Sequence, residues 1–485
     1  MLKPLKPLHL INHHPDVCLC HSKNFVEINE RLSLEAAKAP PITATVVDAA
    51  LSHSEHDQKP HVSPPTDAIT VLVNVRVFDG TQQQLRDGLQ VVVAGQPIQS
   101  IEPQGTPTPA GATIIDGAQG VLMPGLIDAH WHSILVRPTQ MDAMTADFNY
   151  IQALAIAEAQ ATLLRGFTTV RDMGGPVFGL KRAVDEGITL GPRIYPSGAF
   201  ISQTGGHGDF RSLHEIPKTP ASSLSYAEQM GISALADSAD EVRRCAREQL
   251  MRGASQIKYM AGGGVMSQYD GLRVTEGSVE EIRAATLAAE NWGTYVTVHA
   301  YTPDAIRMAI AGGVRCIEHG QLLDEATVEL MADKGIWWCL QPFLDDEDAL
   351  PTSNPFSRAK QVAMSAGTDT AYKLAKKHRI KTAWGTDTLF NEHLAKRQGA
   401  QLAKLARWYE PHEILQMATR VNGELCALSG PRNPYPAKLG VIEAGAWADL
   451  LIVDGNPLED ISLVSRPDEA FVLIMKNGQV VKNTL

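Results

Sequence analysis

Eight short apolar runs, separated by helical stretches, occupy the middle of this chain and restrict the folds that it can adopt. Strands that alternate with helices over about 310 residues are typical of a (β/α)8 TIM barrel with slightly longer loops than usual. The runs are residues 126–132, 167–172, 193–200, 255–260, 294–300, 314–319, 336–342 and 381–387. In such a barrel the chemistry lies at the carboxyl ends of the strands, so the residues that end each run are candidates for a functional site.

A second β-rich pattern occurs near both ends of the chain. It covers residues 69–77, 89–93, 112–115, 448–454 and 471–478. Because connected elements tend to lie together, this pattern predicts a small β-sandwich domain that is built from both ends and interrupted by the barrel. The expected fold class is therefore α/β. We expect an extension at 1–66, the first part of the β-sandwich at 67–124, the barrel at 125–435 and the second part of the β-sandwich at 436–485.

The first 66 residues differ from the rest, because they are rich in Pro, His and Ser and show little periodicity. This composition is typical of a disordered or loosely docked extension. A cluster in this extension could hold a metal ion, but its spacing matches no common structural zinc pattern. It consists of His13, His14, Cys18, Cys20 and His21. We favour a solvated tail over an accessory metal site.

Charge and hydropathy exclude several classes of partner. Lys and Arg number 43 against 54 Asp and Glu, which gives a net charge of −11 and no electrostatic basis for binding nucleic acid or an anionic membrane. No apolar stretch approaches the roughly 18 residues of a membrane helix, and the apolar run 8–11 is too short for a signal peptide. The six scattered cysteines form no disulfide framework, which suggests a reducing compartment. We expect a cytoplasmic protein that acts on a small molecule.

The first run of the predicted barrel ends in His130-Trp131-His132. Side chains alternate along a strand, so His130 and His132 point to one face, whereas Trp131 points away and is expected to pack in the core. Two neutral imidazoles side by side are half of a metal site. Taken alone, the pair could be a chance match on an exposed turn, but the residues downstream favour the metal site. Asp128, in the same run, is expected to be structural.

Three later runs add further candidate ligands. Lys258, flanked by Ile, Tyr and Met, precedes a glycine-rich loop, and a buried cation there requires a special partner or a chemical change such as a carbamate formed with CO2. His299 and His319 each end an apolar run. One histidine in such a place is more often a hydrogen-bonded core residue, but two on consecutive strands, beside His-x-His, favour metal binding.

The sequence Gly-Thr-Asp-Thr occurs twice, at 367–370 and at 385–388. Helical sequence lies on both sides of the first copy, so Asp369 is predicted to be a helix cap on the outside of the barrel. An apolar strand enters the second copy, which predicts that Asp387 lies at the mouth of strand eight. Asp387 is therefore the functional candidate.

These candidates lie on runs one, four, five, six and eight, in that order. They are His130, His132, Lys258, His299, His319 and Asp387. In this order of segments the chain resembles the amidohydrolase superfamily of metal-dependent hydrolases, over roughly residues 68–485. Through residues 201–209 and 263–267 it is similar to the prolidase-like and carboxypeptidase-like group that includes the ochratoxin-hydrolysing amidases. No candidate ligand position departs from the family's pattern.

The resemblance implies two divalent metal ions, expected to be zinc, with manganese or cobalt as alternatives. One ion would be held by His130, His132 and Asp387, and the other by His299 and His319, with a hydroxide and Lys258 carboxylated by CO2 as bridges. The metal-bridged hydroxide would attack an amide carbonyl, and Asp387 would take the proton and return it to the leaving amine.

Two residues are candidates for binding the substrate. His207 lies between glycines after the third run, where it could reach a substrate or cap its loop. Tyr301 follows His299 on the same face and could bind a substrate carboxylate or the oxyanion, or simply pack at the rim.

We therefore predict a binuclear amidohydrolase that cleaves amide or peptide bonds of dipeptides or N-acyl amino acids, with ochratoxin-type amides among the possible substrates. One alternative is a cyclic amidase or a deaminase of the same superfamily, although such deaminases usually use one metal and lack the lysine on strand four. Another is a non-catalytic, assembly-forming member, which typically loses ligands. We also expect a homo-oligomer, with no nucleic acid or membrane partner.

Overall fold

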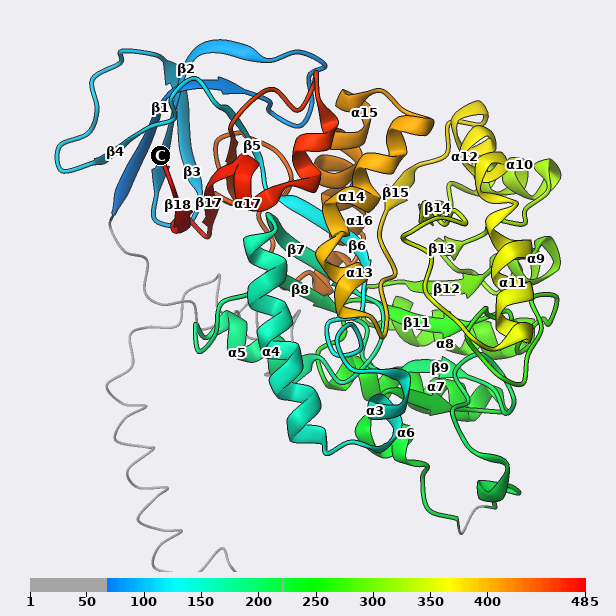
Figure 1. Ribbon diagram of the computed structural model, residues 1–485. Coiled ribbons are helices and arrows are strands. Elements are labelled where there is room, and N and C mark those ends of the chain that lie inside the picture. The colour runs from blue at the N-terminus through cyan, green and yellow to red at the C-terminus, as the bar shows by residue number, and fades with distance from the viewer. Residues whose placement is uncertain (1–67, 220–221) are drawn as a thin grey trace, which may run out of the picture. The chain divides into compact units, whose positions relative to one another are not determined.

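The computed structural model describes residues 68–219 and 222–485 (Figure 1). The predicted extension at 1–66, with its cluster of histidines and cysteines, lies outside the described residues. Within the described part of the chain, no helix is long and apolar enough to span a membrane.

Strands from both ends of the described chain form one eight-stranded sheet, in the order β18-β17-β16-β5-β1-β2-β3, with β4 paired to β1. The strands are β1 (Ile69–Val77), β2 (Arg86–Ala94), β3 (Ile98–Pro103), β4 (Thr113–Asp116), β5 (Val121–Pro124), β16 (Leu450–Val453), β17 (Phe471–Lys476) and β18 (Gln479–Asn483). The two ends meet where β16 pairs antiparallel with β5. Figure 1 shows this meeting as blue and red ribbons side by side. The sequence pattern did not predict β3, β5 or β18.

Alternation of side chains gives this sheet two apolar faces. Leu450 and Ile452 pack in one buried cluster with residues of β1, β2 and β17, whereas Leu451 and Val453 join the large core cluster that also contains residues of the parallel strands. Period-2 alternation therefore allows one sheet to pack on both sides.

Parallel strands form the middle of the chain, in a seven-stranded sheet ordered β10-β9-β11-β12-β13-β14-β15 and a three-stranded sheet ordered β6-β7-β8. Their bounds are β6 (Leu126–Trp131), β7 (Phe167–Asp172), β8 (Arg193–Pro196), β9 (Phe200–Ser202), β10 (Ser233–Leu235), β11 (Ile257–Met260), β12 (Val296–Ala300), β13 (Cys316–His319), β14 (Trp337–Leu340) and β15 (Thr382–Trp384). Each of the eight predicted runs contains at least one of these strands. The α/β class with parallel strands is thus confirmed.

The two parallel sheets are joined by the chain and by side-chain amides. Residues 193–202 bend at Gly198, so that β8 pairs with β7 while β9 pairs with β11. No backbone ladder closes β15 onto β6 among the described residues. Instead, the amide of Asn422 donates to the carbonyls of Ile127 on β6 and Trp384 on β15, at 2.7 and 2.8 Å.

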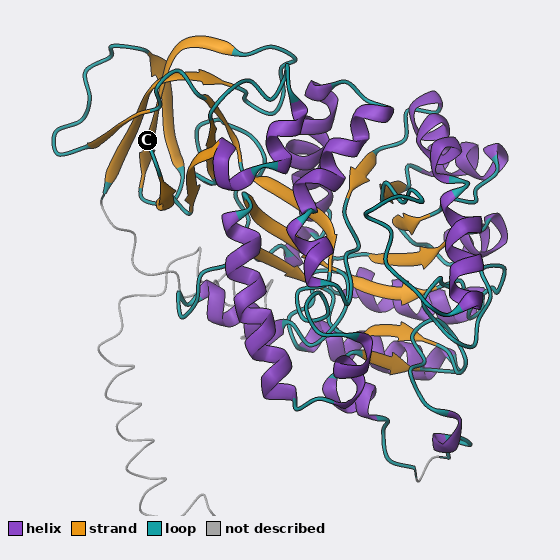
Figure 2. Ribbon diagram, in the orientation of Figure 1, coloured by secondary structure: helices purple, strands orange, loops and turns teal. Residues whose placement is uncertain are grey.

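Helices flank the parallel strands, as Figure 2 shows. The α-helices of the described chain are α3 (Gln140–Thr145), α4 (Phe148–Leu164), α5 (Phe178–Asp185), α6 (Tyr226–Met230), α7 (Ala239–Met251), α8 (Val279–Asn291), α9 (Pro303–Ala311), α10 (Glu325–Lys334), α11 (Pro355–Ser365), α12 (Thr368–Lys377), α13 (Glu392–Lys396), α14 (Gln398–Ala403), α15 (Pro411–Gln416), α16 (Asn422–Ala427) and α17 (Pro467–Ala470). Of these, α17 packs on β17 of the eight-stranded sheet. Ser238 and Ser278 begin α7 and α8 by accepting backbone N–H bonds, as serine N-caps commonly do.

The prediction that Asp369 is a helix cap is wrong. The N-cap of α12 is Gly367, and Asp369 lies in the first turn of that helix. Its carboxylate instead accepts two hydrogen bonds from Arg407, both at 2.7 Å, and one from Trp408 at 2.8 Å. The two helical stretches that suggested a cap are separated only by Ala366 and Gly367, so the helix begins earlier than the motif indicated.

The two structural expectations for β6 are confirmed. Trp131 is buried in an apolar cluster. Asp128 is also buried, and its carboxylate accepts bonds from the backbone N–H of His130, from the N–H and hydroxyl of Thr386, and from Gln398. Asp128 thereby ties the end of β6 to the segment after β15.

Candidate metal centre

One cavity at the carboxyl ends of the parallel strands is lined by all six residues predicted to be metal ligands. It encloses about 1250 Å³, its open mouth included. The register explains this convergence, because Met260 pairs with His299 and Ala300 pairs with His319. Because these neighbouring strands end at the same height, the side chains at their carboxyl ends surround the same cavity. His207 and Tyr301, the predicted substrate-binding residues, line the same cavity.

Asp387 is the centre of the cluster. Its Oδ1 lies 3.2 Å from Nε2 of both His130 and His132, and its Oδ2 lies 4.0 Å from Nδ1 of His319. The ring of His299 lies 4.5 Å from that of His319, measured between centroids. One ligand atom each from His130, His319 and Asp387 lies within 4.8 Å of the other two, which is close enough for one metal ion.

The backbone at this centre is strained. His319 and Asp387 have φ angles of +76° and +52°, a left-handed conformation that is uncommon for residues other than glycine. Such strain concentrates at functional sites, where the surrounding structure holds it. Gly385 permits the approach of the two segments, because a Cβ there would lie 2.4 Å from the backbone nitrogen of His130.

Each of the four imidazoles uses one ring nitrogen to bind a protein oxygen. Nδ1 of His130 lies 2.8 Å from Glu318, and Nδ1 of His132 lies 3.3 Å from the carbonyl of Gly174. Likewise, Nε2 of His299 lies 3.3 Å from the carbonyl of Gly263, and Nδ1 of His319 lies 2.7 Å from the side-chain carbonyl of Gln341. Bonds of this kind fix the tautomer and ring orientation of metal-ligating histidines, and they leave the second nitrogen of each ring available.

Electrostatics favour the ionised carboxylate of Asp387 and the neutral imidazoles of His299 and His319. Burial would raise the pKa of Asp387, but the neighbouring His130, His132 and His319 hold it well below its usual range. Burial lowers the pKa of His299 and of His319 well below the usual value. Metal binding requires deprotonated ligands, so these shifts are in the direction that a metal site needs.

Lys258 on β11 is almost completely buried, with 1% of its surface exposed. Burial lowers the pKa of its amine, although Glu318 and Asp387 oppose the shift. The shift therefore raises the fraction of neutral amine at this position, and a neutral amine is the form that can react with CO2.

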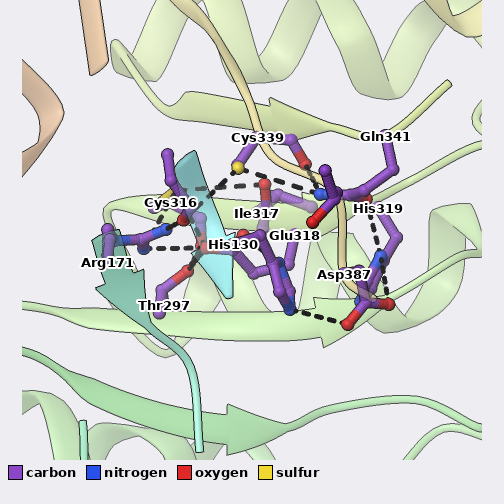
Figure 3. Close-up of polar contacts among 12 residues, drawn as sticks. His130, Arg171, Thr297, Cys316, Ile317, Glu318, His319, Cys339, Gln341 and Asp387 are labelled. Carbon is purple, nitrogen blue, oxygen red and sulfur yellow. Dashed lines mark hydrogen bonds and ion pairs between the residues drawn. The ribbon is translucent and has the colours of Figure 1, made fainter. Parts of the chain in front are cut away.

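Sequence reasoning missed Glu318 and Arg171. Figure 3 shows the Glu318 carboxylate between His130 and Arg171, with Oε2 2.8 Å from His130 and Oε1 accepting from Arg171 at 2.7 Å. Both partners of this ion pair are fully buried, and Arg171 holds the pKa of Glu318 well below its usual range although burial opposes it. The only local signal was a charged residue inside the apolar run that ends at His319, and its partners are distant in sequence.

His207 and Tyr301 lie beside the imidazole of His299. The ring of His207 stacks on His299 at a centroid distance of 4.2 Å, and Tyr301 packs edge-on against His299 at 5.0 Å. Burial lowers the pKa of His207 to about 4, so its ring is neutral near pH 7. Burial also raises the pKa of Tyr301 well above its usual value, which keeps its hydroxyl available as a donor.

The donor set fits divalent transition metals. Four imidazoles with fixed tautomers, one ionised carboxylate and one low-pKa lysine converge on one cavity. Nitrogen and oxygen donors of this kind suit zinc, manganese or cobalt.

Comparison with known proteins places the chain among hydrolases. A model of the amidohydrolase family matches residues 121–482. Ochratoxinase from Aspergillus niger is 32% identical over 385 residues, which are 75% of this chain and 76% of that protein. A prolidase structure complexed with N-methylphosphonate-L-proline is 35% identical, with a TM-score of 0.78 over 86% of this chain and 100% of that chain. A Xaa-Pro dipeptidase with methionine in its active site is 27% identical, with a TM-score of 0.74 over 86% of this chain and 100% of that chain.

Proposed function

Because the chain belongs to the amidohydrolase family and is a hydrolase that acts on amide bonds, we propose that it cleaves its substrate with two divalent metal ions, expected to be zinc. The inner ion would be held by His130, His132 and Asp387, and the outer ion by His299 and His319, with carboxylated Lys258 between them. The observation that carries this proposal is the set of four imidazoles, each with one nitrogen bound to a protein oxygen and the other left available around Asp387.

We further propose that the two parallel sheets are parts of one (β/α)8 barrel and that the eight-stranded sheet folds on itself as the β-sandwich. The Asn422 bridge between β6 and β15 supports closure of the barrel. The buried cluster that β1, β2, β16 and β17 share supports the sandwich. The corresponding domain limits are 67–124 and 436–485 for the sandwich and 125–435 for the barrel. We also propose that the protein forms a homo-oligomer.

Asp387 is proposed to move the proton in the reaction. Two bound metal ions would supply a nucleophile derived from water at neutral pH and would polarise the amide carbonyl. The Asp387 carboxylate is ionised and lies at the centre of the ligand set, so it is placed to accept the proton of the attacking water. The same carboxyl then gives that proton to the leaving amine, so that one residue acts first as base and then as acid.

The proposed substrates are dipeptides or N-acyl amino acids. Ochratoxinase, prolidase and Xaa-Pro dipeptidase among the relatives support an amide next to a carboxylate. The cavity walls include Phe200, Phe210, Met266 and Phe343, which leave room for a bulky apolar group. We assign Tyr301 and His207 to substrate binding because both line the cavity beside the outer imidazoles.

Metal analysis together with a substrate screen tests this function. Purified protein should contain close to two transition-metal ions per chain and should hydrolyse some members of a panel of dipeptides and N-acyl amino acids. Removal of the metal by a chelator should abolish turnover, and added zinc, manganese or cobalt should restore it. Activity in protein with at most a trace of metal would contradict the mechanism.

The free carboxylate of the substrate should contribute to kcat/KM. Conversion of that carboxylate to a carboxamide should lower kcat/KM about 10- to 100-fold, because a buried donor that loses its partner costs about 1 to 3 kcal/mol. Tyr301→Phe should remove much of this discrimination while both metals stay bound. Equal hydrolysis of the two forms, or a preference for cyclic amides or aminated heterocycles, would show that the carboxypeptidase-like specificity is wrong.

Glu318→Gln should weaken metal binding about 10- to 100-fold, because loss of a partner that orients a metal-ligating histidine typically has an effect of this size. Competition with a chelator measures the affinity. Glu424→Gln is the matched control, since Glu424 is an exposed carboxylate that pairs with Arg420 outside the cavity. An unchanged metal affinity in Glu318→Gln would exclude an orienting role.

A further inference from the structure

The loop that carries His207 is fixed at its backbone. The backbone N–H of His207 donates to Oε1 of Glu276 at 2.7 Å, and Oε2 of the same carboxyl accepts from the hydroxyl of Ser202 at 3.2 Å. Gly264 provides the space for the ring, because a Cβ at that position would lie 1.9 Å from Cε1 of His207. The ring of His207 is therefore confined between Gly264 and the ring of His299.

The two nitrogens of this ring have different surroundings. Nδ1 lies 3.0 Å from the hydroxyl oxygen of Ser267 and 3.8 Å from Oδ2 of Asp270. Both of these partners are buried. Nε2 has no hydrogen-bond partner in the part of the chain that the structure describes. Since His207 lines the cavity, Nε2 is the nitrogen available to a bound molecule.

The partners of Nδ1 are themselves held in place. Asp270 is 1% exposed, and its Oδ2 accepts the backbone N–H of Gly264 at 2.6 Å. The hydroxyl oxygen of Ser267 also lies 3.2 Å from the carbonyl oxygen of Gly264. From α11, Lys360 donates to the backbone carbonyls of Ser267 and Asp270 at 2.8 and 3.0 Å. The segment from Gly264 to Asp270 is thus a rigid support, and its side chains meet His207 at one edge of the ring.

We propose that Ser267 and Asp270 are positioning residues for His207. The hydroxyl of Ser267 donates to Nδ1, so that the neutral ring carries its proton on Nε2 and directs it at the carboxylate end of the substrate. Asp270 holds the loop on which the ring packs, through the backbone N–H of Gly264. This inference rests on the proposed function and deepens it, because it identifies how the specificity for a free carboxylate is built. Neither residue contacts the metal ligands through a hydrogen bond in the described structure, so both act through His207. The consequence is a loss of substrate affinity without a loss of metal when either residue is changed.

Steady-state kinetics on matched variants test this role. Ser267→Ala should raise KM for an N-acyl amino acid about 3- to 10-fold, the size of one lost hydrogen bond, and Asp270→Asn should raise KM in the same direction, with two metals per chain and kcat within a few-fold of wild type. In a His207→Ala background, Ser267→Ala should raise KM by less than a further factor of about 2, because the effects of coupled residues are not additive. Ser278→Ala is the matched control, since Ser278 caps α8, and it should leave KM unchanged.

A spectroscopic readout that is independent of turnover keeps the proposal testable if Asp270→Asn folds poorly or if no amide is cleaved. In protein labelled with 15N-histidine, the His207 signals are identified by their absence from His207→Ala. These signals should shift in Ser267→Ala and stay unchanged in Ser278→Ala. An unchanged His207 signal in Ser267→Ala, or an effect of full size on KM in the His207→Ala background, would overturn the proposal. Failure of the wild-type protein to cleave any amide would instead overturn the proposed function.

Discussion

Replacement of Asp387 by asparagine should lower kcat by at least about 100- to 10,000-fold, the contribution typical of a general acid or base. This loss corresponds to roughly 3 to 5 kcal/mol of transition-state stabilisation. The amide of asparagine cannot accept the proton of the attacking water, and it has no negative charge to offer to His130, His132 and His319, which surround this position. Single-turnover kinetics together with metal analysis separate loss of proton transfer from loss of metal.

Asp369 provides the matched control, because it stands in the first copy of the same four-residue motif, at 367–370. Its side chain is 38% exposed, and its bonds to Arg407 and Trp408 lower its pKa to about 2. Asp369→Asn should cost about 0.2 to 1 kcal/mol of stability, the value of an exposed ion pair, and should leave turnover unchanged. If Asp369→Asn is the inactive variant, the assignment of the two copies is wrong.

The sequence was sufficient to order most of the parallel strands, because they lie in short runs rich in apolar residues between helical stretches. β10 (Ser233–Leu235) lies in none of the eight runs. The run 167–172 coincides with β7, and the run 69–77 coincides with β1. Other short strands were missed for different reasons. β5 (Val121–Pro124) is apolar and buried but only four residues long. β18 (Gln479–Asn483) has no buried residue, so its sequence carries no alternation of apolar and polar side chains.

Convergence of the candidate ligands on one cavity could be expected from the same pattern, since parallel strands end on one side of the fold. The contacts that orient these ligands could not be expected from the sequence. Glu318 is 188 residues from His130 in the chain, and Ser267 is 60 residues from His207. Such pairs depend on the rotation of each side chain in the packed structure, and nothing in a single sequence encodes that rotation as a local pattern.

The two Gly-Thr-Asp-Thr copies also show that local sequence does not predict tertiary contacts. Flanking sequence separated them correctly, because only Asp387 follows a buried strand and lines the cavity. It did not predict that Asp369 binds Arg407 and Trp408, which are 38 and 39 residues away. The predicted secondary structure therefore showed on which side of the fold each Asp lies. The hydrogen-bond partners of Asp369 are determined by tertiary packing.

Lys258→Ala should reduce the metal content from about two ions to at most one per chain and should lower activity at least about 100-fold, since metal assistance supplies several kcal/mol to the transition state. An ammonium ion would be costly at this buried position among four imidazoles, whereas an anionic carbamate would bind both ions. Short carboxylic acids should restore part of the metal content and part of the activity in Lys258→Ala, because they can occupy the space of the missing carbamate.

Lys476→Ala is the control for this experiment. Lys476 lies on β17 in the eight-stranded sheet, and burial lowers its pKa to about 8, so it is a second buried lysine with a perturbed amine outside the cavity. Its replacement should leave two metals bound and should give no response to added carboxylic acids. Elemental analysis and turnover measured across a series of acid concentrations decide between the two lysines. Full activity in Lys258→Ala would show that no bridge forms there, and the two metal ions would then have to be held by the imidazoles and Asp387 alone.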